Sequence, residues 1–131
     1  MSTAVSAPSV MSMDSEAVLS AAARKAVLVA PCDGKIVGIT AASLTTPVGA
    51  SIILDVNKNG TTIFGTQANR PTIAVTQTTA TVGANSVTEF NAGDVFTVDI
   101  DQVGSGTAGT GFTVAIAFVG KTAYSAGVDV I

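Results

Sequence analysis

The alternation of apolar and polar residues along this chain predicts a protein built from short β-strands. The pattern is clearest at residues 111–119, where large apolar residues occupy every second position from Phe112 to Phe118. A period of two is typical of a strand that buries one face. Residues 95–101 repeat the pattern. Both segments therefore predict strands with one side in a hydrophobic core.

Residues 51–64 predict a β-hairpin. Apolar and polar residues alternate from Ile52 to Asn57, and Asn59-Gly60 then precedes a second β-prone run. Asn-Gly between two such runs favours a type I′ turn, because both central residues of that turn need a positive φ. We interpret the remaining strands as partners of this hairpin.

Further short strands are expected at residues 26–30, 35–44, 71–75 and 87–90, with a bulge at Gly38. Turn signals separate the predicted strands about every 8 to 12 residues, as in antiparallel sandwiches. The connections are longer than simple hairpins, which favours jelly-roll connectivity. The sequence therefore predicts an all-β protein, an antiparallel jelly-roll-like β-sandwich of about eight strands.

The front of the chain is expected to differ from the rest. Residues 1–13 carry no charge and predict an extended arm that docks on a neighbouring chain. Residues 14–25 predict one short helix, with an N-cap at Asp14 or the next residue and basic residues in the last turn. The predicted domains are thus an arm with a helix at residues 1–25 and a sandwich at 26–131.

Charged residues are unusually scarce. They make up 11% of the 131 residues, against about 25% in a typical soluble domain. A surface with so little charge suits contact with other proteins. A soluble β-protein with a threonine-rich surface would have the same low charge and is the alternative interpretation. The net charge of −3 and the scattered cations disfavour nucleic acid as a partner. No apolar run is long enough to cross a membrane.

The sequence offers little catalytic chemistry. It has no histidine, and its single cysteine, Cys32, cannot form an internal disulfide. Asp99 and Asp101 are expected on one outward strand face, where they could hold Ca²⁺ with Gln102 or a backbone carbonyl. They could also act as a glycosidase pair, but without an apolar pocket, or simply keep an edge strand soluble. We therefore expect no enzyme and no resident cofactor, with calcium as an open alternative.

Three stretches resemble small β-sandwich domains of tailed bacteriophages. They are D-V-N-K-N-G-T-T-I-F at 55–64 with R-P-T-I at 70–73, F-N-A-G-D-V-F-T-V-D-I-D-Q-V-G-S at 90–105, and P-C-D-G-K-I-V-G-I at 31–39. Such domains occur in tail-fibre and receptor-binding tips, and similar jelly rolls serve as capsid decoration (cement) proteins. The resemblance implies a trimeric structural protein without catalytic residues. A fibre domain would be expected to follow a long shaft, whereas only a short arm and helix precede this one.

The leading hypothesis is a capsid decoration protein, made in the host cytoplasm and located in the virion. It would bind the major capsid protein as a homotrimer, so that several modest contacts add up. The alternative is a receptor-binding or fibre-tip domain that contacts the host through residues 57–60 and 104–111. The residues expected to bind partners are Ser2, Val5, Val10, Met11, Met13, Val18, Leu19, Ala115 and Ala117.

Overall fold

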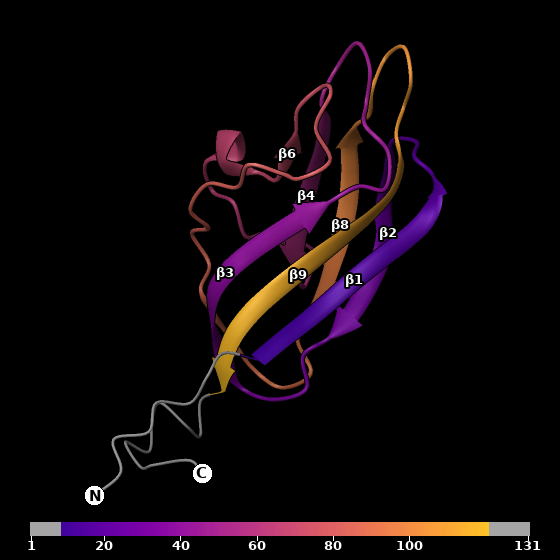
Figure 1. Ribbon diagram of the computed structural model, residues 1–131. Coiled ribbons are helices and arrows are strands. Elements are labelled where there is room, and N and C mark those ends of the chain that lie inside the picture. The colour runs from indigo at the N-terminus through magenta and orange to yellow at the C-terminus, as the bar shows by residue number, and fades with distance from the viewer. Residues whose placement is uncertain (1–8, 121–131) are drawn as a thin grey trace, which may run out of the picture.

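Two antiparallel β-sheets packed face to face form the protein (Figure 1). The computed structural model describes residues 9–120. Its strands are β1 (Ser9–Val18), β2 (Ala22–Val29), β3 (Gly34–Ala42), β4 (Ile52–Lys58), β5 (Thr61–Thr62), β6 (Thr72–Ile73), β7 (Glu89–Phe90), β8 (Val95–Gln102) and β9 (Thr110–Gly120). The helical structure in this range is a 3₁₀ turn, η1 (Gln67–Asn69). The predicted all-β sandwich is confirmed.

The order of the strands is that of a jelly roll. The front sheet has the order β1-β9-β3-β7, and the back sheet has the order β2-β8-β4-β5, with β6 also paired to β4 (Figure 1). The chain changes sheet from β1 to β2, from β2 to β3 and from β3 to β4, and again from β6 to β7, from β7 to β8 and from β8 to β9. Such repeated crossing distinguishes a jelly roll from a meander of sequential hairpins.

The helix predicted at residues 14–25 is wrong. This segment contains the end of β1, a short turn and the start of β2. β1 pairs with β9 from Ser9↔Phe118 to Ser15↔Phe112, so the strand is an integral part of the front sheet. The predicted division at residue 25 is therefore also wrong, because both strands belong to the sandwich. Of the predicted arm, residues 1–8 lie outside the described residues.

Tertiary pairing overrides the local helix signals here. Met11 and Met13 face the back sheet, while the residues between and beside them are exposed. This alternation buries one side of an extended strand, whereas a helix would place these two side chains on different sides. β2 carries a bulge between Ala22 and Ala26, in which Arg24 has a φ of 53°. The backbone N–H of Arg24 donates a 2.7 Å hydrogen bond to Asp99 Oδ1, which holds the bulge on β8.

The hairpin predicted at residues 51–64 is confirmed. Lys58 pairs with Thr61, and the turn residues Asn59 and Gly60 have φ values of 52° and 87°. The predicted bulge at Gly38 is confirmed as well, since the register between β3 and β9 shifts at that point. The strands expected at 71–75 and 87–90 are present but shorter, as β6 and β7.

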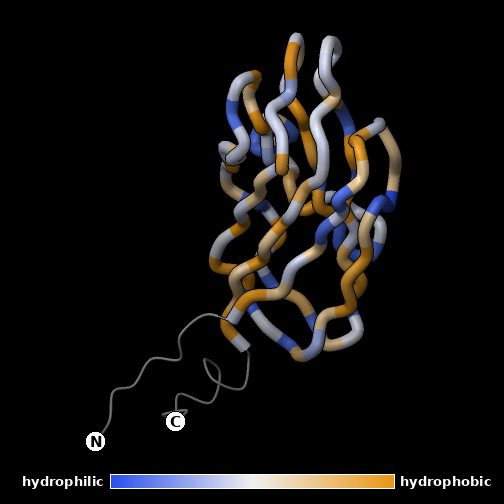
Figure 2. The backbone as a smooth tube through the Cα atoms, turned by 45° about the vertical axis from the view of Figure 1, so that its right-hand side comes forward, coloured by the Kyte–Doolittle hydropathy of each residue, from blue (hydrophilic) through white to orange (hydrophobic). Residues whose placement is uncertain are grey.

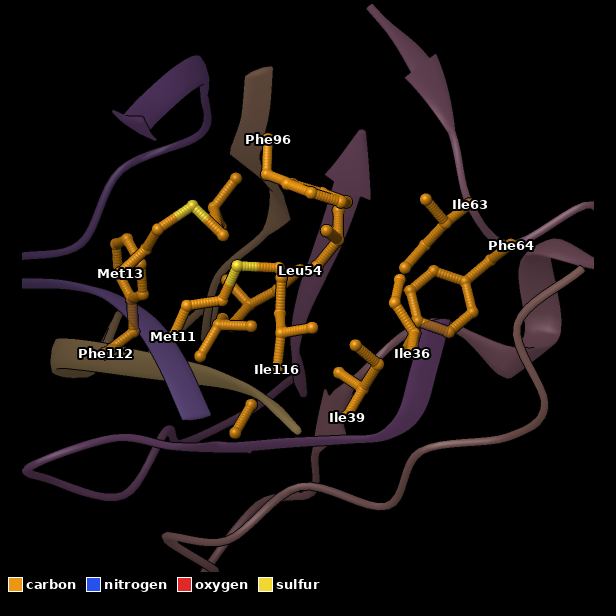
Figure 3. Close-up of a cluster of buried hydrophobic side chains, with 14 of the residues drawn as sticks. Met11, Met13, Ile36, Ile39, Leu54, Ile63, Phe64, Phe96, Phe112 and Ile116 are labelled. Carbon is orange, nitrogen blue, oxygen red and sulfur yellow. The ribbon is translucent and has the colours of Figure 1, made fainter. Parts of the chain in front are cut away.

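The core lies between the two sheets (Figure 3). Its fully buried side chains include Leu54 and Phe96 from the back sheet and Ile116 from the front sheet. The ring of Phe90 packs edge to face against both Phe96 and Phe118, with centroids 5.6 Å apart in each pair. Phe90 thus joins the two sheets at their β7 end. Each such buried side chain contributes about 1.5 to 3 kcal/mol.

Candidate protein-interaction surfaces

One broad surface of the sandwich is free of charge at its centre. We define the outer front face as the side of the front sheet that points away from the back sheet, with the central residues Val10, Ser12, Val37, Gly38, Thr40, Ala115 and Ala117. Cross-strand rows run from Val10 through Ala117 to Gly38, and from Ser12 through Ala115 to Thr40. Charged residues stand at the ends of this face: Asp14 at one end, and Lys35 opposite Glu89 at the other.

The sequence identified part of this surface. Ala115 and Ala117 were expected to bind a partner, and both lie half-buried in the middle of the outer front face. Val10 and Val18, from the same prediction, are 64% and 70% exposed. Whether these residues bind a partner stays a prediction. Ser2 and Val5 lie outside the described residues.

Three residues of the predicted partner-binding set have a different place. Met11, Met13 and Leu19 are 7%, 3% and 3% exposed, and they belong to the core of their own chain. Figure 3 shows both methionines pointing between the sheets, beside Phe112 and Ile116. The prediction is corrected for these three, because a partner cannot contact them while the sandwich is folded.

The β1 and β2 strands expose further apolar residues. Each of them is the edge strand of its sheet, and they pack along the same narrow side of the molecule. Val27 and Val29 on β2 are 63% and 56% exposed, slightly less than the valines of β1. They were not among the residues expected at the surface. The alternation of A-V-L-V-A, in which Leu28 faces inward, was the signal that could have found them.

Figure 2 shows hydrophobic segments along much of the backbone, with hydrophilic ones scattered between them. A small hollow next to the outer front face is one place where acidic and apolar groups meet. It has a cavity volume of about 180 Å³, and its lining includes Asp14 and Glu16 from β1, Phe112 from β9 and the exposed Leu44 that follows β3. No sequence pattern indicates this hollow, because its walls come from three separate segments.

The two carboxylates considered for calcium lie on one side of β8, as expected, but both have protein partners. Asp99 accepts hydrogen bonds from the backbone N–H of Arg24 and from Asn57 Nδ2, at 2.7 and 2.9 Å. Asp101 forms an ion pair with Arg70 at 2.6 Å. Within residues 9–120, no three acidic, thiol or imidazole side chains are grouped to hold a metal ion. Calcium binding therefore stays a prediction without support from this geometry.

A third carboxylate, that of Asp55, lies beside Asp99 and is unexpectedly buried. The alternation in β4 placed it on the polar side, yet it is only 7% exposed. It lies directly opposite Asp99 in the pairing of β4 with β8, and it accepts a 2.6 Å hydrogen bond from the Thr62 hydroxyl. Burial raises the pKa of Asp55, while the Thr62 hydrogen bond opposes that shift. The arrangement is a structural feature of the back sheet with a measurable effect on stability.

The two segments proposed to form one receptor-binding tip are not together. Residues 57–60 lie beside the start of β8, since the N–H of Asn59 donates to the carbonyl of Val95. Residues 104–111 follow the other end of β8. A strand of this length separates the two segments by about 25 Å. Whether either segment contacts a host receptor stays a prediction.

Comparison of the chain with protein-family models, with curated proteins and with solved structures found no match. Function can therefore be inferred from the outer front face, from the exposed residues of β1 and β2, and from the sequence resemblance to phage β-sandwich domains. In residues 9–120, no helix has the length and apolar character needed to span a membrane.

Proposed function

We propose that this chain is a structural protein of a bacteriophage virion, a capsid decoration protein that binds the outer surface of the capsid as a homotrimer. The resemblance of three stretches to phage β-sandwich domains suggests the setting. The observation that carries the role is the outer front face, where no charged residue interrupts the rows through Ala115 and Ala117. A weakly hydrated face of uncharged, mostly small side chains allows close approach of another protein at little desolvation cost.

The mechanism is multivalent attachment. Three copies in one assembly present three outer front faces, so that individually modest contacts multiply into strong retention. Each contact is expected to bury more than about 1,000 Å², the lower range for specific interfaces. The receptor-binding alternative gains no support, because its two loops lie at opposite ends of β8.

Single substitutions on the outer front face test this role. Ala115→Glu places an unpaired carboxylate in the middle of the face, and burying it against a capsid subunit would be costly. We expect at least about a tenfold loss of affinity for capsids prepared without this protein. The matched control is Ala92→Glu, the same change at an exposed turn between β7 and β8. Deleting residues 1–13 would be a poorer test, because it would remove half of β1 from the fold.

The measurement is cosedimentation of purified protein with such capsids over a concentration series. If wild-type protein fails to bind them, the decoration role is wrong. If Ala115→Glu binds as well as Ala92→Glu, the capsid contact lies elsewhere on the molecule. Circular dichroism of each variant verifies that the sandwich has formed.

A further inference from the structure

Most charged side chains within residues 9–120 have a partner in the chain. Lys58 forms an ion pair with Asp94, and Arg70 forms one with Asp101. Asp33, Asp55 and Asp99 accept hydrogen bonds. Lys35 and Glu89 lie opposite each other on β3 and β7, without a direct ion pair. The other four, Asp14, Glu16, Arg24 and Lys25, have neither an ion pair nor an oppositely charged residue across the sheet. All four are exposed.

These four residues divide by sign between the two edge strands. Asp14 and Glu16 are on β1, and Arg24 and Lys25 are on β2. Asp14 belongs to the outer front face, opposite the exposed Thr113 of β9. Lys25 precedes Ala26, which pairs with the buried Val98, so that Lys25 lies on the opposite, back side of the sandwich. Asp14 and Lys25 therefore lie on opposite sides of the sandwich, and within residues 9–120 no ion pair joins the two acidic residues to the two basic ones.

The acidic pair is placed to receive a long basic side chain. Asp14 and Glu16 line the hollow of about 180 Å³ together with the apolar groups of Leu44 and Phe112. Lysine and arginine carry an apolar stem and a charged head, and they bury the stem against apolar surface while the head meets an anion. Carboxylates beside an apolar wall therefore match the chemistry of the unpartnered residues on β2.

We propose that copies of this chain associate head to tail, with Arg24 and Lys25 of one copy against Asp14 and Glu16 of the next. The exposed Val18 on β1 and Val27 on β2 supply the apolar part of the contact. Each contact joins a basic patch of one copy to the acidic patch of the next and is therefore heterologous, and with the three subunits of the proposed function such contacts close into a ring. The inference deepens the proposed function by naming the self-association surface, and it takes the expected three subunits from that proposal.

Charge reversal on the full-length chain tests the pairing. The basic-reversed variant combines Arg24→Glu with Lys25→Glu, and the acid-reversed variant combines Asp14→Lys with Glu16→Lys. The fourfold variant carries all four substitutions and restores opposite charges across the contact. Lys35→Glu is a control that changes the net charge away from both patches. Sedimentation velocity at fixed protein concentration measures the mass of the assembly.

We expect each reversed variant to weaken association by about a hundredfold, because like charges then meet in the contact. The fourfold variant and Lys35→Glu should keep the wild-type assembly. In an equal mixture of the two reversed variants, unlike chains should associate, which also demonstrates that both are folded. They should not close a ring of three, because a ring with an odd number of subunits always leaves one contact between like charges. Raising the salt to about 1 M should weaken the wild-type assembly, because the Debye length falls to about 3 Å.

A wild-type protein that sediments as a single chain would overturn the inference. So would reversed variants with unchanged mass, or a folded fourfold variant that fails to assemble. The capsid-binding test has separate outcomes. A ring that does not bind capsids contradicts the decoration role and leaves the head-to-tail contact in place. A single chain that binds capsids contradicts the head-to-tail contact and the homotrimer, and leaves capsid binding in place.

Discussion

Truncation of Met13 distinguishes a strand of the sandwich from a detachable arm. In the structure, Met13 is 3% exposed and lies between the sheets. Met13→Ala removes three atoms beyond the Cβ, and lost burial alone costs about 2 kcal/mol. The cavity left behind raises the expected loss to about 2 to 4 kcal/mol in the free energy of unfolding. For a domain of this size, that lowers the melting temperature by about 10 °C.

The matched control is Val10→Ala on the same strand. Val10 points to solvent, 64% exposed, so its truncation should change the free energy of unfolding by less than about 0.5 kcal/mol. The protein contains no tryptophan, and far-UV circular dichroism during urea denaturation is therefore the suitable measurement. Protein concentration must be held constant, because association stabilises the folded state by mass action. Equal, small effects at both positions would refute the integral role of β1.

Three further predictions concern single residues. Asp55→Asn should raise the free energy of unfolding at neutral pH by about 0.5 to 1 kcal/mol, because the raised pKa of Asp55 means that ionising it costs stability. Urea titrations should show the wild type losing that stability as the pH rises from about 4 through the folded pKa, with no such loss in the variant. The pKa of Asp94 is shifted in the opposite direction. Hydrogen bonds to its carboxylate, first from the Asn91 N–H, lower that pKa. The ionised Asp94 therefore stabilises the folded state above pH about 4, and this stabilisation is lost on acidification. Thermal melts from about pH 2 to 5 should therefore show a smaller acid dependence for Asp94→Ala. Gly60→Ala should cost about 1 kcal/mol by thermal melting, because Gly60 has a φ of 87°.

Period-two patterning predicted the fold wherever large apolar residues alternated with polar ones. The segments around Phe96 and Phe112 and the Asn59-Gly60 turn were placed correctly for this reason. The sandwich and its jelly-roll connectivity followed from the number of strands and the length of their connections. Local signals were sufficient there, because the residues that define each strand also face the core.

The N-terminal strands could not be placed by local signals. An acidic residue, a run of alanines and two basic residues are a good helix pattern, and only pairing with β9 and β8 makes the segment extended. The burial of Asp55 was not predicted either, because its position in the strand pattern is polar and its hydrogen bond with the Thr62 hydroxyl is seen only in three dimensions. The four unpartnered charges could be recognised only once the neighbours of every other charge were known in three dimensions.

The two faces of β1 have different roles, one in folding and the other in the proposed assembly. Its inward side, with Met11 and Met13, fills the core, whereas its outward side carries Val10 and Asp14. Since alternate residues of a strand face opposite sides, a substitution on one side leaves the other side's contacts in place. Dissociated copies should therefore stay folded, and charge reversal at Asp14 should change the mass of the assembly without changing the unfolding of a single chain. If the copies unfolded as soon as they separated, core residues would have to form part of the contact. The structure places Asp14, Glu16, Arg24 and Lys25 outside the core.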